Sequence, residues 1–217
     1  SSAASDVYKR QQLNRINDMY KKSFLSLMIM LLLATTSCSS EEPAAIEPGR
    51  TISGDAGKTL IVYFSWGGNT RIVANHIHDL IGGDIVEVEM VVPYPDTYEE
   101  VTQIAPGELE SDYCPELKTK VENMDEYDTL IVGTPIWGGH LTSAMKSFLA
   151  GYDLSGKYIA PFCTHGGSGT AQSVSDIRSV CPNSTILGSL AVYGSQAENS
   201  RGDVEKWLEQ IGILKNN

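Results

Sequence analysis

Short apolar runs alternate with amphipathic stretches along the chain between residues 58 and 211. The apolar runs, rich in β-branched residues, cover residues 58–64, 85–92, 129–133, 158–163 and 185–193. The amphipathic stretches between and after them cover 70–80, 141–150, 170–180 and 203–211. Regular alternation of strand and helix predicts a parallel sheet with helices on both faces, because every crossover between parallel strands passes over one face.

Two parts of this pattern differ from the rest. Residues 85–92 alternate apolar and acidic positions, which is typical of an edge strand with one wetter face. The connection over residues 96–126 has helical periodicity only in pieces, interrupted at Pro106 and Pro115, because proline removes a helical hydrogen bond. We therefore expect an edge strand followed by a long, irregular connection.

Residues 19–37 have the features of a bacterial signal peptide. Lys21 and Lys22 precede an apolar stretch over 24–34, which is about half the ~20 residues that a membrane-spanning helix needs. The small residues that follow end at Cys38, and this ending resembles the signal of bacterial lipoproteins. The resemblance implies an exported protein, lipidated at Cys38 and anchored to a membrane, that faces the periplasm or the cell exterior.

The residues on either side of this segment show no pattern of a folded domain. Met19 stands where an initiator is expected, so residues 1–18 are interpreted as a non-native or mispredicted extension. Residues 38–57 are rich in Ser, Glu, Pro, Ala and Gly, a composition that predicts a flexible tether. The folded domain is therefore expected over residues 58–217.

Charge and cysteine content narrow the class of function. The chain has 16 basic and 27 acidic residues and no basic cluster in the expected domain, which excludes a nucleic-acid footprint. Small molecules or basic proteins are the expected partners. The cysteines of the domain, Cys114, Cys163 and Cys181, are an odd number that argues against a disulfide framework, and Cys163 is expected to be buried at a strand end. No spacing of Cys or His predicts a metal site.

Three loops rich in glycine follow predicted strands, over residues 65–69, 133–139 and 164–169. The carboxyl ends of parallel strands meet at one edge of a sheet, and ligands of open α/β sheets bind outside this edge. The three loops are therefore the predicted ligand site.

The first of these loops joins a strand to a helix and has the chemistry of a phosphate site. Gly67 and Gly68 allow a close approach of the backbone, and the helix N-terminus adds free N–H groups. Neutral donors are present at Ser65, Asn69 and Thr70. The absence of a lysine excludes the P-loop of nucleoside triphosphatases and favours a monophosphate. Taken alone, the loop also fits a tight strand-to-helix turn.

Together the three loops resemble those of the flavodoxin family. Residues 63–70, Tyr-Phe-Ser-Trp-Gly-Gly-Asn-Thr, are similar to the flavodoxin phosphate loop, and residues 133–139 and 163–169 are similar to the second and third flavin loops of a bacterial flavodoxin-like subfamily. The similarity spans roughly residues 58–213 and departs from the usual pattern at Gly67, where a hydroxyl residue is common. It implies a flavodoxin-like, three-layer α/β/α fold with a five-stranded parallel sheet in the order 2-1-3-4-5.

The resemblance also implies that the domain binds FMN, with the phosphate on the first loop, the isoalloxazine ring against the second and the pyrimidine edge facing the third. The implied cofactor-binding residues are Ser65, Trp66, Gly67, Gly68, Asn69, Thr70, Thr134, Pro135, Ile136, Trp137, Gly138, Gly139, Thr164, His165, Gly166, Gly167, Ser168 and Gly169. The residue types agree with these roles. Trp137 offers a flat surface for stacking, and Gly138 and Gly139 leave a carbonyl free to turn toward flavin N5.

Other side chains near the loops have open roles. His140 and His165 can bind the flavin or a substrate carbonyl, or remain surface imidazoles. Trp66 can flank the flavin ring or only cover its own loop. The third loop lacks an aromatic residue, which leaves one flavin face open unless Tyr94 or Tyr98 covers it.

Three functions stay open at this point, and no catalytic residue is predicted. The first is electron transfer to a redox partner protein. The second is an FMN-dependent NAD(P)H or quinone reductase that serves a small electron acceptor at an open flavin face. The third is a non-redox, lipid-anchored binding protein. An acidic domain with no cation near the loops except Arg71 disfavours the anionic reduced flavin, so we expect a low redox potential.

Overall fold

The computed structural model describes residues 44–214. The predicted extension at residues 1–18, the signal peptide at 19–37 and the lipidation site Cys38 lie outside the described residues. Over the part of the chain that is described, no helix combines the length and the apolar character needed to cross a lipid bilayer.

Five parallel strands form the centre of the sheet. They are β2 (Thr59–Tyr63), β3 (Asp84–Glu87), β4 (Thr129–Pro135), β5 (Tyr158–His165) and β7 (Ser189–Tyr193). Their spatial order is β3-β2-β4-β5-β7, and every neighbouring pair is parallel. Numbered along the chain, this is the predicted order 2-1-3-4-5, so the flavodoxin-like sheet is confirmed.

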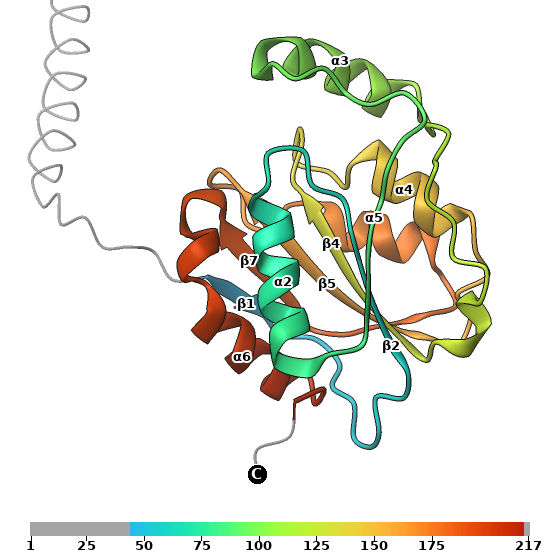
Figure 1. The fold of residues 1–217 in the computed structure, drawn as a ribbon, viewed down its shortest axis with the longest axis vertical. Helices are drawn as coiled ribbons and strands as arrows, with labels where there is room; N and C mark the ends of the chain where they lie inside the picture. The colour runs from blue at the N-terminus through green and yellow to red at the C-terminus, as the bar shows by residue number, and fades with distance from the viewer. Residues whose placement is uncertain (1–43, 215–217) are drawn as a thin grey trace, which may run out of the picture. The chain divides into compact units, whose positions relative to one another are not determined.

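Helices cover both faces of this sheet, as Figure 1 shows. One face carries α2 (Asn69–Ile81) and α6 (Arg201–Gln210), and the other carries α4 (Ser143–Ala150) and α5 (Ser173–Val180). The three-layer α/β/α prediction is therefore confirmed.

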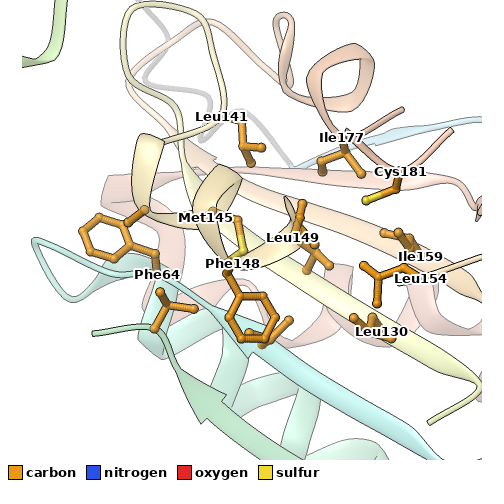
Figure 2. Packing of buried hydrophobic residues seen from close by; sticks show 14 of the residues in the cluster. Phe64, Leu130, Leu141, Met145, Phe148, Leu149, Leu154, Ile159, Ile177 and Cys181 are labelled. Carbon is orange, nitrogen blue, oxygen red and sulfur yellow. The ribbon is translucent and has the colours of Figure 1, made fainter. Parts of the chain in front are cut away.

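Each face of the sheet has its own hydrophobic core, because successive side chains of a strand point to opposite faces. In β2, Leu60 packs into the core under α4 and α5, whereas Ile61 packs into the core under α2 and α6. Figure 2 shows the first of these cores, where Met145 and Phe148 of α4 lie over the sheet together with Leu130 of β4. Side chains from both faces of the central strands are fully buried.

The connection between β3 and β4 is more regular than its pattern indicates. The helix α3 (Tyr98–Glu110) runs unbroken through Pro106, so the predicted interruption there is wrong. The hydroxyl of Thr97 accepts a hydrogen bond from the Glu100 N–H and begins the helix. The break predicted near Pro115 is confirmed, and only the short 3-10 helix η1 (Met124–Glu126) precedes β4.

Residues 44–57 are packed into the domain, contrary to the prediction that the flexible tether extends to residue 57. Strand β1 (Ala45–Glu47) pairs antiparallel with β7 and extends the sheet by one edge strand. Ile52 is buried, and its N–H donates a hydrogen bond to the Ile211 carbonyl oxygen at 2.9 Å. Isolated apolar residues in a polar segment gave too weak a pattern to predict this strand.

The fifth predicted strand is also divided in two. The short β6 (Thr185–Ile186) pairs with β5 and is followed by Leu187 and Gly188, after which β7 begins. At this break the Trp207 indole donates a hydrogen bond to the Gly188 carbonyl oxygen at 2.8 Å. After β7 the 3-10 helix η2 (Gly194–Asn199) leads into α6. With β1 and β6 the sheet of the described residues has seven strands rather than five.

The three cysteines of the domain are free thiols. Cys163 is buried near the end of β5, as predicted, and its Sγ donates a long hydrogen bond of 3.7 Å to the Gly169 carbonyl oxygen. Burial raises the pKa of the Cys163 thiol to about 12. Cys114 is exposed.

The raised pKa of Cys163 predicts a loss of stability at alkaline pH. Between its unfolded pKa of ~8.5 and its folded pKa, the unfolded chain loses the thiol proton while the folded chain keeps it. The free energy of unfolding therefore falls as pH rises, by up to about 1.4 kcal/mol per pH unit from this group. The Cys163→Ala variant should lose stability less steeply than the parent in urea titrations across this pH range, while Cys114→Ala should match the parent. Parallel pH curves for parent and Cys163→Ala would contradict the prediction.

The packing of residues 44–57 predicts different effects for two glycine substitutions in this segment. A Cβ placed on Gly49 would lie 2.4 Å from the Gly188 nitrogen, whereas one placed on Gly54 would meet nothing within 4 Å. Gly49→Ala should therefore lower the free energy of unfolding by about 1–3 kcal/mol, and Gly54→Ala should change it by less than about 0.5 kcal/mol. Urea unfolding measures both. A free tether would make the two variants equal.

Candidate functional site

A cavity of about 570 Å³ lies at the carboxyl edge of the sheet. Its walls come from the loops after β2, β4, β5 and β7, and from α3. The predicted residues that line it are Trp66, Gly67, Asn69, Thr70, Pro135, Ile136, Trp137, Gly138, Thr164, His165 and Gly166. All three predicted loops thus meet at one cavity, and its volume is within the ~300–1,000 Å³ typical of small-molecule sites.

The other predicted residues lie in the same loops without lining the cavity. They are Ser65, Gly68, Thr134, Gly139, Gly167, Ser168 and Gly169. Several of them shape the loops instead. Gly68 has a φ of 90° at the start of α2, and the buried Thr134 hydroxyl forms a hydrogen bond of 3.1 Å with the Thr142 hydroxyl.

Sequence reasoning missed two parts of the cavity wall. One is the loop after β7, which supplies Tyr193, Gly194 and Ser195. Because β7 is parallel to its neighbours, its carboxyl end had to reach the same edge, and this could have been predicted. The other part is the face of α3 formed by Val101, Thr102, Ala105 and Pro106, which was hidden by the assumption that Pro106 breaks the helix. Tyr98 on the same face had been named as a residue that could cover the site.

The N-terminus of α2 forms one end of the cavity. Asn69 and Thr70 line it, and their N–H groups have no acceptor within the helix, since they belong to its first turn. The next N–H, that of Arg71, donates to the Ser65 hydroxyl at 3.2 Å, so Ser65 holds the loop in place. The positive end of the helix dipole and these N–H groups together favour an anion at this point.

No Lys, Arg, Asp or Glu lines the cavity over the described residues. The nearby cation Arg71 lines a neighbouring hollow of about 460 Å³, where Glu87 accepts hydrogen bonds of 2.6 and 2.9 Å from its guanidinium. The bonds to Glu87 raise the pKa of Arg71. An anion in the cavity must therefore be held by neutral donors and the helix N-terminus.

Hydrogen bonds hold the loops to one another. The hydroxyls of Thr70 and Thr164, from the first and third loops, lie 2.8 Å apart in a buried contact. The Ile136 N–H of the second loop donates to the Thr164 carbonyl oxygen at 2.9 Å. Thr164 thus connects the three loops into a single hydrogen-bonded unit.

The second loop is a tight turn over residues 137–140. The backbones of Trp137 and His140 exchange hydrogen bonds of 3.2 and 2.9 Å, and Gly138 and Gly139 between them have φ values of 57° and 86°. Two successive positive φ values are the mark of a type I′ turn, which glycine adopts without strain. The Gln172 N–H binds the Gly139 carbonyl oxygen at 2.8 Å, which leaves the Gly138 carbonyl as the one able to face a ligand.

His140 belongs to the support of this turn and not to the cavity wall. Its Nδ1 lies 3.1 Å from an Asp176 carboxylate oxygen, and the same carboxylate accepts the Leu141 N–H at 3.0 Å. Asp176 lies in the first turn of α5. The helix therefore positions the turn, and the role of His140 as a surface imidazole paired to Asp176 is the one the structure supports.

Three aromatic rings contact the ring of Trp137. Its ring makes edge contacts with Phe64, Trp66 and Tyr94 at centroid distances of 6.0, 6.3 and 4.9 Å. Of the two tyrosines left open as a cover for the site, Tyr98 lines the cavity, whereas Tyr94 is buried against Trp137 and does not line it. The indole N–H of Trp66 donates to the Pro95 carbonyl oxygen at 2.8 Å, which fixes its ring.

His165 lies on the wall formed by the third loop. Its ring is buried and lies 4.4 Å from the Tyr193 ring, centroid to centroid. Nδ1 accepts the Gly167 N–H at 2.9 Å, so a neutral imidazole carries its hydrogen on Nε2. Tyr193 supplies the aromatic group that the third loop lacks.

Within the described residues, no cluster of three His, Cys, Asp or Glu could hold a metal ion.

Solved structures with a similar fold include three bacterial flavoproteins. One from Bacteroides eggerthii is 24% identical, with a TM-score of 0.62, over 72% of this chain and 99% of its own. One from Bacteroides uniformis is 24% identical, with a TM-score of 0.58, over 70% of this chain and 98% of its own. A Lactobacillus acidophilus flavoprotein in complex with FMN is 23% identical, with a TM-score of 0.55, over 66% of this chain and 97% of its own.

The family comparison covers most of the chain. No curated protein matches the sequence. The model of the flavodoxin family, by contrast, matches residues 58–211, a range that contains every strand and loop of the parallel sheet. The chain therefore belongs to the flavodoxin family.

Proposed function

We propose that the protein binds FMN in the cavity and functions in electron transfer. The observation that carries this proposal is the convergence of three glycine-rich loops on one uncharged cavity that has a helix N-terminus at one end and aromatic walls. The FMN complex of the Lactobacillus acidophilus relative supports the choice of cofactor. Bound FMN would supply one-electron and two-electron redox chemistry.

The residues of the cavity fit the parts of FMN. The N-terminus of α2, with Asn69 and Thr70, would hold the phosphate through N–H groups and neutral side-chain donors. Trp137 would lie against the ring system in an orientation that its aromatic neighbours fix. The Gly138 carbonyl could accept a hydrogen bond from a protonated ring nitrogen, and His165 of the third loop lines the same cavity.

A second candidate, an FMN-dependent reductase for a small electron acceptor, is favoured by one observation. The cavity extends from the three flavin loops to α3, so its wall includes a helix that is not required to hold the flavin. A carrier that only exchanges electrons with proteins has no requirement for this extra wall.

Gly67 provides a test of the phosphate site. A Cβ at Gly67 would meet nothing within 4 Å, so a serine fits there and adds a hydroxyl donor to the loop that would hold the phosphate. A hydrogen bond to a charged group contributes about 1.5–3 kcal/mol, so Gly67→Ser should bind FMN about tenfold more tightly than the parent. Titration followed by flavin fluorescence measures the affinity.

The controls separate the added hydroxyl from other effects. Gly67→Ala adds the same carbon without the donor and should leave FMN affinity unchanged. Riboflavin, which lacks the phosphate, should bind parent and Gly67→Ser equally. Equal tightening for FMN and riboflavin would place the phosphate elsewhere, and failure of the parent to take up FMN would refute the proposed function.

A further inference from the structure

The inner face of α3 is a wall of the cavity with a composition of its own. The positions that line the cavity, Tyr98, Val101, Thr102, Ala105 and Pro106, recur at helical spacing and carry no charge. The charged positions of this helix are Glu99, Glu100, Glu108 and Glu110. An acidic helix thus presents an uncharged, mostly apolar face to the cavity.

Contacts at both ends hold α3 over the cavity. Before the helix, the Pro95 carbonyl oxygen accepts the Trp66 indole N–H. Near its C-terminus, Glu108 accepts a hydrogen bond of 2.5 Å from the Tyr94 hydroxyl, and Lys146 of α4 pairs with Asp112. Figure 1 shows α3 standing apart from the sheet beyond the upper ends of α4 and α5. Helix α3 is thus held at both ends and forms a roof over the cavity, and its residue Val101 is buried in the core under α4 and α5.

The charges around the cavity restrict what can bind beneath this roof. A charged ligand would lose its hydration without gaining a counter-charge, since no charged side chain lines the cavity within the described residues. A nicotinamide dinucleotide carries a diphosphate, and no charged side chain of the cavity wall supplies a counter-charge for it, while the N-terminus of α2 is already required by the FMN phosphate in the proposed function. The acidic residues of α3 disfavour a further anion.

Aromatic side chains favour a flat molecule in the same place. Tyr98 of α3 and Trp137 of the second loop both line the cavity, and Tyr193 lines it from the loop after β7. Tyr98 is 74% exposed, so its ring is held by no close packing and can lie against a ligand. We propose that the α3 side of the cavity is a binding site for a neutral, flat aromatic molecule of the quinone type, next to the FMN ring. This inference rests on the proposed FMN site.

The test uses the full chain loaded with FMN and two quinones of similar size. Equilibrium dialysis compares the neutral 2-methyl-1,4-naphthoquinone with the anionic 1,2-naphthoquinone-4-sulfonate, and reads binding independently of activity. We expect the neutral quinone to bind at least about tenfold more tightly, because the anion finds no counter-charge. Equal affinities, or an NADH affinity as high as that of the neutral quinone, would overturn the proposal.

A pair of tyrosine variants locates the site. Tyr98→Ala removes a ring from the cavity wall and should weaken binding of the neutral quinone about three- to tenfold, the usual contribution of one aromatic contact. Tyr113→Ala is the control, because Tyr113 lies in the same connection, is also exposed and does not line the cavity. Equal effects of the two variants would refute the placement under α3.

Failure of this inference is distinguishable from failure of the proposed function. An FMN titration of each variant precedes the dialysis, which is then run at an FMN concentration that saturates that variant. A chain that takes up FMN and binds no neutral quinone refutes only the site under α3. A chain that takes up no FMN refutes the proposed function, and the site beside the flavin ring with it.

Discussion

Parallel pairing of β2, β4, β5 and β7 is the constraint on which the rest of the molecule depends. It brings the carboxyl ends of four strands to one edge, so that four loops far apart in sequence share one cavity wall. The register is fixed by close packing as well as by hydrogen bonds. Gly133 pairs with Phe162, and a Cβ on Gly133 would lie 2.1 Å from the Phe162 ring. Gly133 is therefore required for strand packing, whereas the other glycines of the same loop shape the turn at the cavity.

Much of the fold and of the site follows from local sequence. The apolar runs of β2, β4 and β5 are buried on both faces, so they appear in the sequence as continuous apolar stretches. The glycines after them indicate loops that need a positive φ or a close approach of the backbone. The site loops were predictable for this reason. The order of the strands came from the family resemblance, because alternation alone gives a parallel sheet without its order.

The parts that were not predicted depend on contacts that the local sequence does not record. Strand β1 has only three residues, and its partner β7 lies far along the chain, so the sequence pattern does not predict that the two strands pair. Pro106 lies within α3 although a proline removes a backbone hydrogen bond from a helix, so the local sequence indicates a break that the structure does not have. Tyr193 is the last residue of β7, whose following loop has a single glycine, and only the topology shows that this residue reaches the cavity.

Electrostatics sets the cavity apart from the rest of the domain. The protein has a formal net charge of −11, yet no acidic or basic side chain lines the cavity over the described residues. Arg71 is near enough to help an anion, but Glu87 holds its guanidinium in the neighbouring hollow. The field at the cavity therefore comes from backbone dipoles, including that of α2, and from charged residues that do not line it. Such a field supports a phosphate at one end and disfavours added negative charge at the other.

Tyr94 connects the roof of the cavity to the flavin loops. Its ring packs against Trp137 with centroids 4.9 Å apart, and its hydroxyl donates to Glu108 of α3. Burial raises the pKa of Tyr94, so the hydroxyl keeps the proton that it donates. Any displacement of α3 must therefore either break this hydrogen bond or move a ring that contacts Trp137. Because Trp137 also begins the Gly138–Gly139 turn, the position of the roof and the geometry of the second loop are mechanically coupled.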